Sequence, residues 1–203
     1  ALQASSLLRG LSLGLGLCKS SPRRGLSSIS DATRSSDTLV VSRKSDLGKL
    51  SGAVAARLRT SGLANLSAMG PQAVHTALRA VALSAEYLRT ERPDQELLVA
   101  AERGLALAAS VPAQDGSSSL VEMKLEARLL PRTRPPAKEE EMLISQKTNI
   151  GNAAAFLATR LAESGNPMLR GMGAVAASQA LKAVAIARTY VARAHPGEEL
   201  LVA

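Results

Sequence analysis

The chain has 203 residues, a formal net charge of +8 and 46% hydrophobic residues, which are ordinary values for a folded protein. Only 1% of the residues are aromatic, so base stacking on aromatic side chains is excluded as a main way of binding nucleic acid. One cysteine excludes an internal disulfide framework and a thiolate zinc site, and we expect neither a metal nor a cofactor. No apolar run approaches the roughly 20 residues that a membrane-spanning helix needs, so we expect no membrane contact.

The first 36 residues have the composition of an organelle-targeting leader. Residues 1–30 lack acidic residues and are rich in Leu, Ser, Gly and Arg, as mitochondrial and plastid transit peptides are. The stretch Arg24-Gly25-Leu26-Ser27 resembles the neighbourhood of a matrix-protease cleavage site, whereas residues 11–17 also resemble a short secretory core. We expect residues 1–36 to be a basic leader or, if ordered, an extension held against a large partner such as RNA or neighbouring subunits.

Positive charge is concentrated in this leader. Residues 1–36 contain five lysine or arginine residues and one aspartate, which is half of the excess positive charge of the chain. The remainder is therefore only mildly basic, and the net charge alone does not indicate a nucleic-acid-binding surface.

Residues 38–100 and 141–203 form an internal repeat. They align without a gap at a constant offset of 103, and about 24 of about 63 aligned positions are identical. Because the two copies must fold alike, each copy tests the secondary structure predicted for the other.

The elements of copy one follow in chain order. The apolar run 39–41 predicts a short buried strand, and Ser45 is a good N-cap for a helix that ends at Gly62. A strand near Leu66, a second helix from Pro71 and a third strand at 97–99 come next. Residues 121–129 alternate apolar and charged side chains, which predicts a half-buried fourth strand.

Copy two repeats this order but ends before a fourth strand. Its first strand is predicted at 142–144, and Thr148 is the N-cap candidate of its first helix. We expect either that the chain continues or that a neighbour supplies the missing edge. The predicted units are a leader at 1–36, repeat 1 at 37–130, a Pro-rich linker at 131–140 and repeat 2 at 141–203.

Several motifs resemble the stage V sporulation protein S family. In copy two these are Ser145, Lys147, Ala158, Gly165, Gly173-Ala174 and the run QALKAVAIAR at 179–188, and in copy one Lys44-Ser45, Met69-Gly70 and ALRAVA at 77–82. That family belongs to the Alba-like superfamily, in which two helices cover one face of a four-stranded sheet. The resemblance implies an α+β fold with two tandem β-α-β-α-β-β modules, nucleic-acid binding, commonly by dimers, and no enzyme activity. We expect the two repeats to pack as a pseudo-symmetric pair that stands in for such a dimer.

The candidate nucleic-acid-binding residues are basic. In Alba-like proteins a basic residue after the first strand reaches the phosphate backbone, and Lys44 and Lys147 match that place, each just before a helix N-terminus that favours anions. Arg43 accompanies Lys44, but copy two has Gln146 there. The alternative for these residues is that they are solvated neighbours of a helix cap.

Two further groups are weaker candidates. The stripe His75, Thr76, Arg79 on the second helix, with its counterpart Ser178, Gln179, Lys182, is predicted opposite the apolar face, where a solvated surface is the alternative. Arg23 and Arg24 of the leader are expected to thread into RNA. Arg57 and Arg160 are identical in both copies, but a helix arginine usually covers apolar surface with its stem.

These observations predict a non-enzymatic RNA-binding subunit of a mitochondrial ribonucleoprotein, with the mitochondrial ribosome as the first expectation. Its partners would be RNA, expected to be ribosomal, and neighbouring proteins, in the mitochondrial matrix rather than a plastid. The alternatives are a free organelle nucleic-acid-binding protein, nucleoid-associated or chaperone-like, and a purely structural subunit of another large organelle assembly.

Overall fold

The computed structural model describes residues 11–19, 37–104, 121–131, 140–163, 167–196 and 198–202. Module 1 contains β2 (Thr38–Val41), α1 (Leu47–Ser61), β3 (Leu63–Met69), α2 (Pro71–Arg89), β4 (Gln95–Arg103) and β5 (Glu122–Pro131). Module 2 contains β6 (Glu140–Ile144), α3 (Ile150–Glu163), β7 (Pro167–Gly171), α4 (Gly173–Ala194) and β8 (Glu198–Val202). Both are preceded in the sequence by β1 (Leu11–Lys19).

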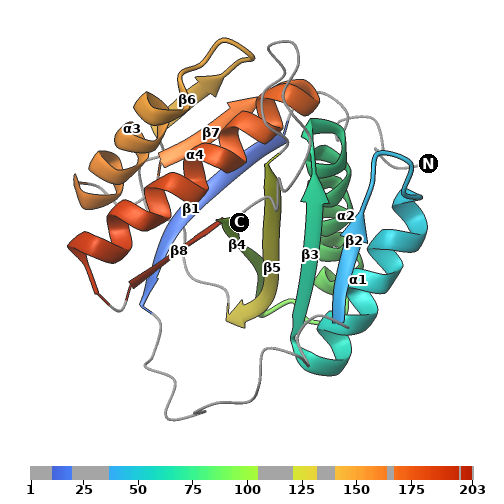
Figure 1. Ribbon diagram of the computed structural model, residues 1–203. Helices are drawn as coiled ribbons and strands as arrows, with labels where there is room; N and C mark the ends of the chain where they lie inside the picture. The colour runs from blue at the N-terminus through green and yellow to red at the C-terminus, as the bar shows by residue number, and fades with distance from the viewer. Residues whose placement is uncertain are drawn as a thin grey trace.

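The described strands form one eight-stranded sheet in the order β2-β3-β5-β4-β8-β1-β7-β6. The outer pairs β2–β3 and β6–β7 are parallel, and the inner pairs are antiparallel. The two modules meet where Val99 of β4 pairs with Val202 of β8, which is its counterpart in the repeat. Figure 1 shows α1 and α2 with the β2–β3 half and α3 and α4 with the β6–β7 half. The α+β class, the two tandem modules and their pseudo-symmetric pairing are thereby confirmed.

The last strand of module 2 comes from the other end of the chain. β1 lies between β7 and β8 and is antiparallel to both, as β5 lies between β3 and β4. A continuing chain or a neighbouring molecule was expected at this position, and β1 occupies it in this structure. Residues 11–19, which lie in the segment expected to be a leader or an ordered extension, form a strand of this sheet.

The turns that join the parallel strands to α2 and α4 depend on glycine. Gly70 has φ 84° and Gly173 has φ 82°, and both residues directly precede or begin a helix. Residues with a Cβ rarely adopt this conformation, so the repeated Met-Gly pair is explained by the backbone geometry of a strand-to-helix turn.

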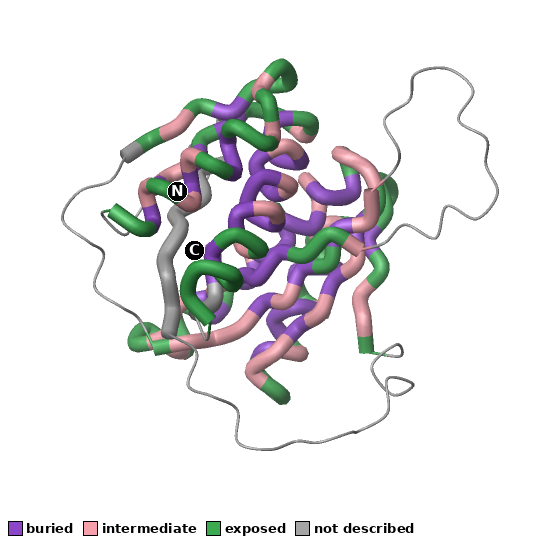
Figure 2. Tube along the Cα trace, turned by 60° about the vertical axis from the view of Figure 1, so that its left-hand side comes forward, coloured by how far each residue is buried: buried purple, intermediate pink, exposed green. Residues whose placement is uncertain are grey.

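The core is a single aliphatic cluster that includes residues of both modules. The apolar faces predicted for the helices are buried, as Val54, Leu58 and Leu78 in module 1 and Leu157 and Leu181 in module 2 illustrate. Figure 2 shows the buried segments, in purple, gathered in the middle of the molecule, with most exposed segments, in green, around them. Many of the buried positions of α2 and α4 are alanine, which allows the two helices to pack closely against each other.

Candidate nucleic-acid interface

The loop between β2 and α1 is closed by a set of short hydrogen bonds. The Ser42 N–H donates to Oγ of Ser45 at 2.9 Å, and the Ser45 N–H donates to the Ser42 carbonyl oxygen at 3.1 Å. The Lys44 N–H donates to Oγ of Ser42 at 3.2 Å. These bonds hold the backbone of Lys44 in a turn while the residue itself is exposed.

The loop between β6 and α3 has the same arrangement. The Ser145 N–H donates to Oγ1 of Thr148 at 2.8 Å, and the Thr148 N–H donates to the Ser145 carbonyl oxygen at 3.2 Å. The Lys147 N–H donates to Oγ of Ser145 at 3.2 Å, and Lys147 is exposed. The pattern Ser-x-Lys-Ser/Thr therefore builds one turn twice, with a lysine at the same position in each.

The N-caps lie one residue later than the sequence predicted. The Lys49 N–H donates to Oδ1 of Asp46 at 2.8 Å, which makes Asp46 the N-cap of α1. Asn149 has the same role in α3, since the Asn152 N–H donates to its Oδ1 at 3.1 Å. The predicted caps were wrong because the hydroxyls of Ser45 and Thr148 bond back to residues three positions earlier, so the next residue caps the helix.

The two lysines present free positive charge beside these helix starts. Among the described residues, no hydrogen bond or ion pair engages the side chain of Lys44, Lys147 or Arg43, and all three residues are exposed. Gln146, the counterpart of Arg43, is also exposed. The pairings of the sheet give β2 and β6 opposite directions, so the two turns follow strands that run oppositely in the sheet.

Only one residue of the stripe predicted on the second helices is exposed. Arg79 on α2 is exposed, but its counterpart Lys182 on α4 is half-buried. Ser178 is only 3% exposed, and Oε1 of Gln179 is buried without a hydrogen-bond partner among the described residues. The prediction that the stripe lies opposite the apolar face is wrong for Ser178 of α4, because α4 packs against α2 and also lies on β4 and β8.

His75 has an environment that opposes its positive charge. It lies on α2 and is partly buried. Burial lowers the pKa of His75 below its ordinary value, and the nearby positive charge of Arg79 lowers this pKa further. The lowered pKa favours the neutral form of His75, which carries no positive charge toward a nucleic acid.

The arginines that are identical in the two copies have structural contacts. Arg57 donates to the carbonyl oxygen of Asp37, and its Nη2 lies 3.4 Å from the Asp37 carboxylate. Nη1 of Arg160 donates to Glu163 at 2.8 Å, and its guanidinium lies 5.7 Å from the centre of the Phe156 ring. Both arginines therefore have partners within their own module.

The leader arginines predicted to contact RNA are not placed by the structure. Arg23 and Arg24 lie outside the described residues.

Exposed apolar residues accompany the lysine loops, which the sequence did not predict. Val40 and its counterpart Leu143 are 80% and 72% exposed, although both lie in runs predicted to be buried strands. Met69 and its counterpart Met172, at the end of the neighbouring strand, are 54% and 72% exposed. Successive side chains of a strand point to opposite faces, and this alternation was the signal available in the sequence. Val41 and Ile144 are buried, so the residue before each of them, Val40 or Leu143, faces away from the helices.

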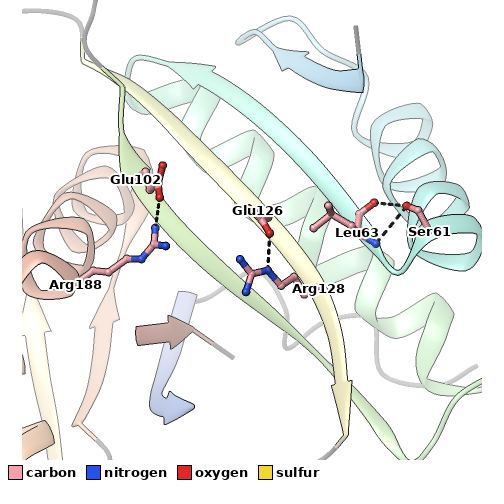
Figure 3. Close-up of polar contacts among 6 residues, drawn as sticks. All are labelled: Ser61, Leu63, Glu102, Glu126, Arg128 and Arg188. Carbon is pink, nitrogen blue, oxygen red and sulfur yellow. Dashed lines mark hydrogen bonds and ion pairs between the residues drawn. The ribbon is translucent and has the colours of Figure 1, made fainter. Parts of the chain in front are cut away.

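One contact between the modules is polar. Nη1 of Arg188 on α4 donates to Oε1 of Glu102 on β4 at 2.6 Å (Figure 3). Figure 3 also shows two contacts within module 1, Arg128 with Glu126 and Ser61 with the backbone of Leu63. The Arg188–Glu102 contact helps to hold α4 against the sheet of module 1.

Other kinds of site are absent from the described part of the chain. No group of three or more His, Cys, Asp and Glu residues there could hold a metal ion. None of the helices in that part is long and apolar enough to cross a membrane.

Comparison with known proteins assigns both repeats to one family. A family model described as stage V sporulation protein S matches residues 37–99 and again residues 140–198. The two matches cover most of module 1 before β5 and most of module 2, and together they span more than half of the chain. No curated protein matches the chain.

Proposed function

Because the chain belongs to the stage V sporulation protein S family, whose Alba-like resemblance implies nucleic-acid binding, we propose that it is a non-enzymatic protein that binds RNA through the phosphate backbone. The observation that carries the proposal is the duplicated Ser-x-Lys-Ser/Thr turn. Each copy holds an exposed lysine directly before a helix start.

The chemistry of the two turns suits phosphate. The first N–H groups of a helix and the helix dipole favour an anion, and lysine adds a positive charge without reading bases. Asp46 places a negative charge at the start of α1, but Arg43 offsets it there, whereas module 2 has the uncharged Gln146 and Asn149. Each turn therefore keeps one net positive charge.

The exposed apolar residues beside the turns give the surface a second component. Val40 and Leu143 lie on the same strands that lead into the lysine turns. We expect them to contact sugars or base faces of single-stranded RNA, since few aromatic residues are present to do so.

The setting that we propose is a mitochondrial ribonucleoprotein, with the mitochondrial ribosome first. The support is the composition of residues 1–36, which have the Arg- and Ser-rich, acid-poor character of a transit peptide. Immunoprecipitation of the tagged chain from cross-linked mitochondria, followed by sequencing of the bound RNA, tests this setting. Recovery of ribosomal RNA is the expected result, and recovery of no RNA contradicts it.

Binding through the turns is tested with the double variant Lys44→Ala, Lys147→Ala. Anisotropy of a fluorescent unstructured RNA, titrated between about 50 and 200 mM salt, gives the affinity and its salt dependence. Losing two phosphate contacts should reduce the slope of log K against log salt by about 1.4, because each contact to a single strand contributes about 0.7. The loss should be similar for RNAs of different sequence.

The matched control is Arg89→Ala, Arg193→Ala, which removes two positive charges from the last turns of α2 and α4. It should leave the salt slope nearly unchanged. Equal slopes for the two double variants would show that the binding follows overall charge and not the turns. A chain that binds no isolated RNA but remains in a large particle would favour the purely structural alternative.

A further inference from the structure

Module 2 is complete only with a strand that its own repeat does not contain. In the sheet, β7 and β8 are not paired with each other, and β1 fills the position between them. Leu11 to Gly14 pair with Gly171 to Met168 of β7, and Leu15 to Lys19 pair with Val202 to Glu198 of β8. Without β1, both of these strands would present unpaired backbone groups toward each other.

The register of β1 is the register of β5. In module 1, Leu125 pairs with Leu66 of β3; in module 2, Leu13 pairs with Leu169, the counterpart of Leu66. The pairs that β5 and β1 form on their other flank, with β4 and β8, agree in the same way.

Ala127 pairs with Val99 of β4, and Leu15 pairs with Val202, the counterpart of Val99. β1 and β5 both lie outside the aligned repeats, yet they occupy equivalent places in the two modules, with the same register on both flanks. The gap between β7 and β8 therefore specifies both the direction and the register of its strand.

The sequence of β1 has the pattern that this position requires. Leucine occurs at every second residue, at 11, 13, 15 and 17, and Leu11, Leu13 and Leu15 take the register positions of Met123, Leu125 and Ala127, which are buried in module 1. Ser12, Gly14 and Gly16 lie between them. A strand with one apolar face and one face of small residues fits a sheet covered by helices on one side.

Sequence neighbours do not hold β1 in this place. β2, the next element along the chain, is at the edge of the sheet in module 1, whereas β1 lies within module 2. We propose that the gap between β7 and β8 is a strand-binding site for residues 11–19, and that it holds this segment whether or not the segment remains covalently joined to the rest of the chain. Cleavage near Arg24, as predicted for a transit peptide, would then leave β1 bound to module 2.

The register is tested with the single cysteine of the chain. Cys18 is the register partner of Glu199, so Glu199→Cys places two cysteines opposite each other in an antiparallel pair, at a distance that a disulfide can span. Mild oxidation should consume most free thiols and give a cross-link within one chain on a non-reducing gel. Glu198→Cys, one residue away and paired with Lys19, is the control that should cross-link much less.

Each outcome of the cross-linking decides about the site. A cross-link between two chains also supports it, with the strand donated by a second copy. Cross-linking of Glu199→Cys at the level of the control overturns the proposal.

Retention of the segment is tested on the full chain with a protease recognition sequence inserted between residues 20 and 36. The folded protein is cut, and size-exclusion chromatography with mass spectrometry then follows both pieces. Co-elution of the short piece with the remainder is expected, and elution of the short piece alone overturns the proposal.

A proline variant separates strand pairing from unspecific association. Gly14→Pro removes a backbone donor in the strand, opposite Met168, and should release the short piece after cutting. Ser28→Pro, which lies outside β1, should not. Retention of the Gly14→Pro piece would show that strand pairing does not hold it and would overturn the proposal.

Discussion

Truncation of Leu66 or Leu169 to alanine should destabilise the whole protein to a similar extent. The two leucines are counterparts on β3 and β7, are 1% and 0% exposed, and belong to one core cluster. Each substitution removes three carbon groups at about 0.8 kcal/mol each and leaves a cavity, so we expect a loss of about 2 to 5 kcal/mol in the free energy of unfolding. Leu143→Ala, at a 72% exposed position, is the control and should change it by less than about 0.5 kcal/mol.

Urea unfolding followed by circular dichroism at the helix band measures these changes. Because the core and the sheet are continuous across the modules, we expect a single transition in each case. With a slope of roughly 1–3 kcal/mol per molar urea, each truncation should shift the midpoint by about 0.7 M or more. Two separate transitions, with each variant moving only one of them, would refute the inference that the modules share one core.

Three further outcomes are expected. Gly62 ends α1 at φ 69°, and a Cβ there would touch nothing within 4 Å. Gly62→Ala should therefore lower the free energy of unfolding by about 1–2 kcal/mol, from backbone strain alone. Gly52→Ala, exposed inside α1 with no neighbour within 4 Å, should instead stabilise by about 0.5–1 kcal/mol. Burial, and then the charge of Arg79, lower the pKa of His75 in the folded state. At a pH near the ordinary pKa of histidine, the unfolded chain therefore binds more protons at this residue than the folded chain does. Stability should therefore fall as the pH drops from about 7.5 to 5.5, and His75→Gln should lose part of that fall in melting experiments; an identical pH profile would contradict the assignment.

The sequence predicted the repeated elements because local signals agree in both copies. The helix that ends at Gly62, the helix that begins at Pro71 and the strand at 122–131 lie where the periodicity and the turn residues placed them. Lys44 and Lys147 were also placed correctly just before a helix N-terminus, since both precede a capping residue at the same offset in the repeat. These features depend on hydrogen bonds between residues close in sequence.

Three predictions made from the local sequence failed, one for a helix cap and two for burial. Ser45 is a plausible N-cap by residue type, yet its hydroxyl bonds to Ser42 and Asp46 caps the helix. Val40 reads as part of a buried strand, yet β2 lies at the sheet edge and Val40 is exposed. Ser178 reads as part of a stripe opposite the apolar face, but the packing of α4 buries it.

The sequence by itself determined that two similar β-α-β-α-β units follow one another, because apolar periodicity, caps and glycine turns act over a few residues. Only the tertiary structure decided that residues 11–19 complete the second unit and that the modules share one sheet. A strand can satisfy its backbone groups with any edge of suitable direction and register, so its partner depends on which edges remain unpaired after the rest of the chain has folded.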